Sequence, residues 1–363
     1  MTDLFDPLTL RGLTVPNRVW LAPMCQYSCL AQDGVPTDWH VVHLGARATG
    51  GFGLLIAEAS AVVPEGRISP QDAGIWNDEQ VAAWRRVTDV VHEHSSAAIG
   101  IQLAHAGRKA STRSPLEVLA GAEDGTVPPA EGGWPTVAPS AVAFPGLATP
   151  RELSTEEVAA LPEAFAAAAR RADAAGFDLV EIHAAHGYLL HEFCSPLSNQ
   201  RTDRYGGDFA GRTRLVVEVV DAVRAAFPAE KPVAIRFSAT DWLDGGWTVE
   251  ETARLTTLLG DRIDLVDVSS GALLPAPIPV GPGYQVPLAE QLRRESGALT
   301  GAVGLITEPE QAQGILDAGQ ADVVLLARAG LREPAWPLRA AHALGRGWRD
   351  APYPPQYTRG AWR

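Results

Sequence analysis

Two histidines and a tyrosine lie within six residues of one another, in the segment HAAHGY: His183, His186 and Tyr188. All three side chains can donate hydrogen bonds, and a phenol can also give up its proton. The short run 177–182 before them has the composition of a buried strand, and parallel α/β proteins hold their ligands at the C-terminal ends of strands. The pattern predicts a site that polarises an oxygen atom and protonates a neighbouring atom.

A metal site is the alternative interpretation of the same segment. His183 and His186 could act as ligands together with His191 or Glu192. The spacing does not match HExxH or a similar motif, so we expect no metal here.

Composition favours small-molecule chemistry. The chain has 363 residues, with 43 acidic against 30 basic ones, and a formal charge of −13. Such a protein has no general attraction for nucleic acid or for an anionic membrane. The first residues show no targeting signal, and we see no apolar run of about 18 residues. Three cysteines are too few for a disulfide framework, so we expect a soluble cytoplasmic protein with reduced thiols.

The elements that position these side chains follow an alternating pattern. Eight short β-like runs, most of them apolar on both faces, alternate with helical stretches, which predicts a closed (β/α)8 barrel of the TIM type. The runs are 19–24, 53–59, 98–103, 177–182, 232–237, 265–269, 299–304 and 323–327. Capping boxes are expected at three helix starts, Ser154 with Glu157, Thr248 with Glu251 and Thr307 with Glu310, and helix ends at Gly176, Gly260 and Gly319.

Three segments lie outside this minimal barrel. Residues 1–18 are expected to fold across its bottom as an N-terminal cap. The stretch 110–150 is too long for an ordinary connection after the third strand and is interpreted as a lid beside the site. The end of the chain, 351–363, is proline-rich and carries large side chains typical of interface anchors. No linker divides the chain, so we expect one domain over 1–363.

Other candidate site residues stand at the ends of the predicted strands. Cys25 and Tyr27 follow the first run, and Gln102 ends the third, where its amide suits a heterocycle edge. Arg236 lies within the apolar fifth run and requires an anionic or electron-rich partner, although a structural ion pair is the alternative.

The last two strands predict a phosphate site. Gly301, Gly304, Arg328 and Gly330 stand at their ends. In these barrels that corner commonly binds phosphate, because glycines allow backbone N–H groups to approach and arginine supplies charge. A phosphate-bearing cofactor is therefore expected.

Nearly the whole chain resembles the Old Yellow Enzyme family of FMN-dependent ene-reductases, and specifically its bacterial, thermophilic-like class. The motifs that carry the resemblance are APMCQYS, IQLAHAGRK, EIHAAHGYLLHEFCSPLSNQRTDRYGG and QYTRGAW. The resemblance implies non-covalent FMN, a reductant that is NADPH or NADH, and an activated alkene as substrate. It implies ring contacts from Pro23, Met24, Cys25, Ala59, Gln102 and Arg236, and phosphate contacts from Gly304, Ala327 and Arg328. Family members often have Gly-Arg where this chain has Ala327-Arg328.

The family mechanism agrees with the chemistry expected of the histidine cluster. His183 and His186 are expected to bind the carbonyl oxygen of an α,β-unsaturated compound, while hydride from flavin N5 reaches Cβ and Tyr188 protonates Cα. The tail resembles a family segment in which an arginine crosses a subunit interface, so Arg359 is expected near Tyr27 of a neighbour in a homodimer or homotetramer. Two other functions remain open, an FMN barrel that reduces tRNA uracil and a non-catalytic flavin-binding protein.

Overall fold

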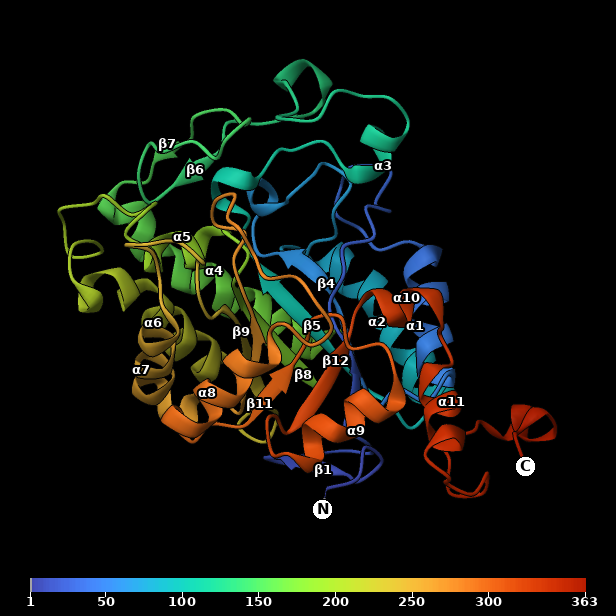
Figure 1. Ribbon diagram of the computed structural model, residues 1–363. Coiled ribbons are helices and arrows are strands. Elements are labelled where there is room, and N and C mark those ends of the chain that lie inside the picture. Colours follow the sequence, from blue (N-terminus) through green and yellow to red (C-terminus); the bar gives the residue numbers. More distant parts are fainter. Residues whose placement is uncertain (1) are drawn as a thin grey trace.

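A computed structural model describes residues 2–363 and shows a closed barrel of eight strands with helices around it (Figure 1). Neighbouring strands pair in parallel all the way round, in the order β10-β11-β12-β3-β4-β5-β8-β9. The barrel strands are β3 (Val19–Leu21), β4 (Leu54–Ala61), β5 (Ala98–Ala104), β8 (Leu179–Ala184), β9 (Val233–Ser238), β10 (Leu265–Ser269), β11 (Thr300–Ala302) and β12 (Val323–Leu326). Each of the eight predicted runs forms one strand, which confirms the (β/α)8 barrel.

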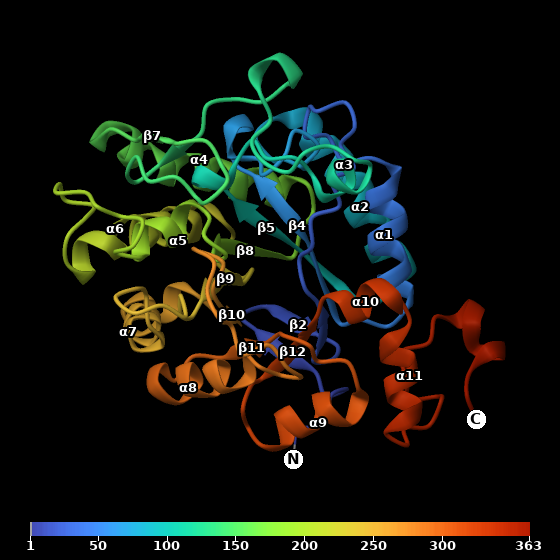
Figure 2. The same ribbon diagram turned by 45° about the horizontal axis from the view of Figure 1, so that its top comes forward.

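The helices cover the outside of the barrel (Figure 2). The longer ones are α1 (Asp38–Thr49), α2 (Asp78–His94), α4 (Thr155–Ala174), α6 (Phe209–Ala226), α7 (Val249–Leu259), α8 (Val286–Ser296), α9 (Pro309–Asp317) and α11 (Trp336–Ala343). Short helices are α3 (Pro115–Leu119), α5 (Leu189–Cys194) and α10 (Arg328–Arg332). The 3-10 helices are η1 (Pro64–Gly66), η2 (Gly107–Lys109), η3 (Pro129–Glu131), η4 (Gly260–Arg262) and η5 (Pro355–Gly360). A large apolar core lies between strands and helices, and a smaller one fills the lumen of the barrel.

The three expected capping boxes have three different outcomes. Ser154 and Glu157 form the reciprocal pair at the start of α4. At α7 the Thr248 hydroxyl caps the helix, but the Glu251 carboxylate pairs with an arginine, Arg212, at 2.6 Å. The box at Thr307 and Glu310 is wrong, because α9 begins one residue later with Glu308 as its N-cap.

Glutamine replaces the expected partner at α9. The Gln311 side chain accepts a hydrogen bond from the backbone N–H of Thr307, so this donor is satisfied without Glu310. The three helix ends are confirmed: Gly176, Gly260 and Gly319 all have positive φ just beyond α4, α7 and α9.

A hairpin near the N-terminus closes one end of the barrel, as predicted for residues 1–18. Strands β1 (Leu8–Leu10) and β2 (Leu13–Val15) pair antiparallel. Leu10 and Val15 pack into the apolar cluster of the lumen, which includes Trp20 and Leu54. The opposite end is therefore left for a ligand.

The segment 110–150 spans the end of the barrel opposite to β1 (Figure 1). It contains α3, η3 and β6 (Val137–Ala138), which pairs in parallel with β7 (Arg151–Glu152). Arg108 and Arg201 fix it by donating to the backbone carbonyls of Val142 and Pro139.

Of the helices that the structure describes, none has the length and apolarity required to cross a membrane.

Candidate active site

The loop after β8 holds the histidines and the tyrosine together. His183 belongs to β8, and the chain then turns through His186 and Gly187, which have φ of 58° and 69°, before Tyr188 caps α5. The His183 ring meets the His186 ring at 5.2 Å and the Tyr188 ring at 5.1 Å between centroids, both edge to face. A Cβ on Gly187 would come within 2.4 Å of the Ala272 carbonyl oxygen. The turn therefore requires glycine, and it gathers three donor groups in one place.

Hydrogen bonds indicate which ring atoms carry protons. The His183 Nδ1 accepts from the backbone N–H of Ala185 at 3.3 Å, so its proton is on Nε2. The His186 Nε2 lies 2.6 Å from the Ser269 hydroxyl oxygen, and the Ser269 hydroxyl in turn donates to Gln285. Either atom of this pair can be the donor, and His186 can donate to an oxygen when its proton is on Nε2.

Burial keeps the site groups neutral. Burial, with Arg236 and Lys109 as positive neighbours, lowers the pKa of both His183 and His186 well below the usual value. Burial also raises the pKa of Tyr188 well above its usual value. At neutral pH the site thus presents neutral imidazole donors and a protonated phenol, which is suited to donating rather than accepting protons.

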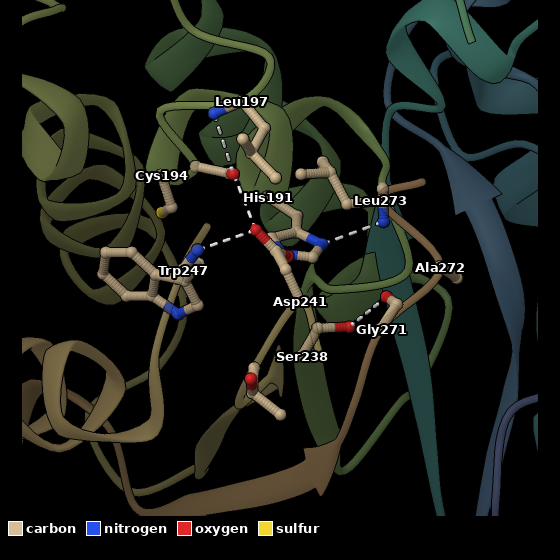
Figure 3. A network of polar contacts seen from close by, with 12 residues as sticks. His191, Cys194, Leu197, Ser238, Asp241, Trp247, Gly271, Ala272 and Leu273 are labelled. Atoms are coloured by element: carbon tan, nitrogen blue, oxygen red, sulfur yellow. Dashed lines mark hydrogen bonds and ion pairs between the residues drawn. The ribbon is translucent and has the colours of Figure 1, made fainter. Parts of the chain in front are cut away.

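A buried carboxylate, that of Asp241, supports this loop through His191 (Figure 3). The His191 Nδ1 accepts from the backbone N–H of Gly187 at 2.9 Å, and its Nε2 lies 2.8 Å from Asp241. Asp241 also accepts from Ser195 and from the backbone of Trp247, both at 2.7 Å. Burial alone would raise the pKa of Asp241, but His191 and these donors hold it below the usual value. His191 is therefore a support of the loop, with its nitrogens already engaged.

Beside the loop, Ser238 on β9 joins two segments. Its hydroxyl accepts from the backbone N–H of His186 at 2.9 Å. It donates to the Gly271 carbonyl at 2.9 Å (Figure 3). The left-handed turn at His186 is thus fixed through the backbone as well.

Inside the barrel, the predicted ring contacts Gln102 and Arg236 both meet carboxylates. Gln102 donates to Glu181 at 2.7 Å, and the Arg236 Nε lies 3.0 Å from Asp267. Burial raises the pKa of both carboxyl groups, that of Glu181 to about 8, while Arg236 opposes the shift. Arg236 therefore forms the structural ion pair that the sequence left as the alternative, and the same side chain also lines a cavity.

The loop after β3 carries Pro23, Met24, Cys25 and Tyr27. Its backbone is fixed by Glu58, which accepts from the N–H of Gln26 at 3.1 Å. Glu58 sits at an irregularity of β4, after which Ala59 is paired with Gln102. Cys25 is a half-buried free thiol whose pKa is raised well above the usual value by burial and by the carboxylates of Asp72 and Glu58. The thiol is therefore protonated, which disfavours a nucleophilic role.

A cavity of ≈ 160 Å³ lies at the ends of β11 and β12, where a phosphate was expected. It is lined by Gly304, Ala327 and Arg328, the residues expected at the phosphate, and also by Tyr284, Gln285 and Arg332. The φ of Ala327 is −97°, outside the left-handed region that favours glycine. Gly304 has φ of 121°, and a Cβ there would lie 2.8 Å from the Gln285 amide nitrogen. Gly301 and Gly330 do not line the cavity.

These surroundings fit FMN. Two arginines one helical turn apart and a glycine with no space for a side chain suit a phosphate. Amide and guanidinium groups inside the barrel suit the polar edge of a flavin ring.

Within residues 2–363, no group of three or more His, Cys, Asp or Glu side chains is placed to hold a metal ion.

Arg359 is remote from these groups within one chain. It is exposed on η5, in the C-terminal segment that extends outward beside α11 (Figure 2). The Trp362 ring stacks on His342 at 5.6 Å, while 44% of its surface and 55% of that of Tyr357 are exposed. One chain alone does not bring Arg359 to Tyr27.

Comparison with known proteins identifies relatives along almost the whole chain. Residues 3–346 match the model of the NADH:flavin oxidoreductase / NADH oxidase family. An NADPH dehydrogenase of Geobacillus sp. (strain WCH70) is 47% identical over 360 residues, which cover 96% of this chain and 99% of the relative.

Solved structures agree. Morphinone reductase in complex with tetrahydroNAD has a TM-score of 0.77 at 31% identity, with 96% of this chain and 92% of that chain covered. The Old Yellow Enzyme homologue from Zymomonas mobilis has a TM-score of 0.77 at 29% identity, with 95% and 94% covered.

Proposed function

Because the chain belongs to the NADH:flavin oxidoreductase / NADH oxidase family, that of Old Yellow Enzyme, and is an NAD(P)H-dependent FMN oxidoreductase, we propose that it reduces activated alkenes. The substrates are α,β-unsaturated carbonyl compounds, namely enones, enals and maleimides. When bound, FMN would supply the hydride chemistry, accepting hydride from NADPH or NADH and passing it through N5 to Cβ of the alkene. The cofactor is held by the glycine-lined cavity with Arg328 and by Gln102, Arg236 and the loop Pro23–Cys25.

The histidine pair binds the carbonyl oxygen of the substrate. His183 presents its Nε2–H, since its other nitrogen accepts from Ala185. His186 exchanges the Ser269 hydroxyl, 2.6 Å away, for the substrate oxygen. Both rings are neutral, and each keeps one N–H that can donate to the oxygen. These hydrogen bonds stabilise the negative charge that develops on the oxygen.

Tyr188 gives its proton to Cα. Its ring lies 5.1 Å from that of His183, so a substrate bound to His183 has its carbon skeleton near the phenol. The raised pKa of Tyr188 keeps the phenol protonated up to high pH.

The observation that carries the proposal is this grouping of two neutral imidazoles and one protonated phenol, close to Arg236 and the flavin-ring loop. Its test is a colour cycle. The purified protein should be yellow, should be bleached by NADPH without oxygen, and should regain colour on addition of cyclohexenone. Bleaching without recolouring by any enone or maleimide would refute alkene reduction while leaving the NADPH dehydrogenase activity in place.

We further propose a shared substrate site. Arg359 reaches the active site of a neighbouring subunit near Tyr27 in a homodimer or homotetramer. The exposure of Tyr357 and Trp362 on a segment that extends from the barrel supports this arrangement.

A further inference from the structure

The chain contains only two lysines, Lys109 and Lys231, among its 30 basic residues. Arginine thus occupies nearly every position where a cation is required. Lys109 follows β5 on η2, at the edge of the active site, and its side chain is partly buried. Its compact ammonium group has three donors, which can be directed to different acceptors, whereas a guanidinium presents its donors in a fixed planar fork.

The ammonium group of Lys109 joins two loops of the site. It donates to the carbonyl oxygen of His186 at 2.8 Å and to that of Ala272 at 3.1 Å. These carbonyls belong to the loops after β8 and β10, which also touch where Gly187 approaches Ala272. One side chain therefore connects three strand ends of the barrel.

The same ammonium group lies on two aromatic rings. It is 5.1 Å from the centroid of the Tyr188 ring and 4.8 Å from that of Phe144, which belongs to the lid segment. Both distances are within the range of cation–π attraction. Lys109 thus contacts the phenol and the backbone of the neighbouring histidine at once.

The loop requires such support. His186 is not a glycine but has φ of 58°, a conformation that side chains rarely adopt and that persists only when its surroundings enforce it. A charged donor bound to its carbonyl oxygen is the strongest single hydrogen bond available for that purpose. The charge remains present at neutral pH, because burial lowers the pKa of Lys109 only to about 8.

We propose that Lys109 is a positioning residue, which holds His186 and Tyr188 in register for carbonyl binding and proton donation. It acts through the backbone of His186 and the ring of Tyr188 and does not touch the substrate. This inference rests on the proposed alkene reduction.

The test compares Lys109→Met with the matched variant Lys231→Met. Lys231 also donates to two oxygens, those of Asp173 and Phe177, at 2.7 and 2.8 Å, and lies away from the site. Three quantities are measured on the FMN-loaded proteins: amide hydrogen exchange of 184–188, turnover of cyclohexenone per bound FMN, and the solvent deuterium isotope effect on that turnover.

Lys109→Met should speed exchange in 184–188 and lower turnover about tenfold to a hundredfold, the scale of loss for a hydrogen bond to a charged group. Its solvent isotope effect should rise, because a displaced phenol makes proton transfer more rate-limiting. An inactive fraction of protein would not alter that ratio. Lys231→Met should match wild type in all three.

Wild-type exchange in 184–188, or an unchanged isotope effect in folded Lys109→Met, would overturn the positioning role. Failure of the proposed function has a different signature, since the wild-type protein itself would then not turn over cyclohexenone.

Discussion

Replacing Gly304 by alanine tests the assignment of the FMN phosphate site. Gly304 lines the cavity at the ends of β11 and β12 with φ of 121°. The new Cβ would lie 2.8 Å from the Gln285 amide nitrogen and 3.1 Å from Tyr284. Gln285 cannot easily move aside, because its amide is bonded to the Val303 carbonyl at 3.0 Å and to the Ser270 hydroxyl at 2.6 Å.

The backbone conformation alone costs about 1–3 kcal/mol for a residue other than glycine. In the FMN-free variant the cavity wall shifts and relieves this strain. Binding of the phosphate requires the original wall geometry, so the strain returns and weakens binding. At 1.4 kcal/mol per tenfold, the dissociation constant of FMN should rise roughly 5- to 150-fold.

The assay is fluorescence titration of apoprotein with FMN, with circular dichroism to confirm folding. Gly314→Ala is the control, since Gly314 lies within α9 and a Cβ there meets no atom within 4 Å. A folded Gly304→Ala protein that binds FMN as tightly as wild type would show that the phosphate is held elsewhere.

Four further outcomes are expected. His183→Ala should slow reoxidation by cyclohexenone about 10²–10³-fold without loss of FMN, the scale for removal of one donor to a developing oxyanion; stopped-flow absorbance measures it, and a wild-type rate would contradict the assignment. Cys25→Ala should remain active with a shifted flavin potential in a spectroelectrochemical titration, because the thiol lies in the loop assigned to the ring; an unchanged potential would refute the tuning role. Deletion of 356–363 should raise the KM for enones and weaken the dimer in sedimentation, and identical behaviour would end the shared-site proposal. The hydrogen bond to Asp178 raises the pKa of His92, so this pair stabilises the fold below the unfolded pKa near 6.5. The contribution is lost as pH rises through the folded pKa. In denaturant unfolding, His92→Gln should therefore lose more free energy of unfolding relative to wild type at pH 6 than at pH 9.

The architecture could be predicted because each strand and helix carries a local signal. The run that ends at Ile182 is apolar and short, and the box of Ser154 and Glu157 is a local pair of hydrogen bonds. The capping box expected at Thr307 is wrong because a local pattern of this kind also occurs by chance. The side chain of Gln311, and not that of Glu310, accepts the hydrogen bond from the Thr307 backbone N–H.

The supports of the site could not be predicted, because they depend on which strands become neighbours. Asp241 lies 50 residues after His191 in the chain, and only the neighbouring positions of the β8 and β9 ends join them. The same holds for Gln285 at the phosphate cavity, and for Lys109, whose partners belong to the loops after β8 and β10. Lys109 was part of a recognised motif, but the sequence contained no signal of its contacts with carbonyl groups.

The most direct test of alkene reduction follows hydrogen from reductant to product. Cyclohexenone is reduced in ordinary water with NADPH that carries deuterium at both C4 positions, and the product is analysed by NMR. We predict deuterium at Cβ and a solvent proton at Cα, and the reverse labelling when unlabelled NADPH is used in deuterium oxide. Deuterium from NADPH at Cα, or at neither carbon, would contradict hydride delivery to Cβ with proton donation by Tyr188.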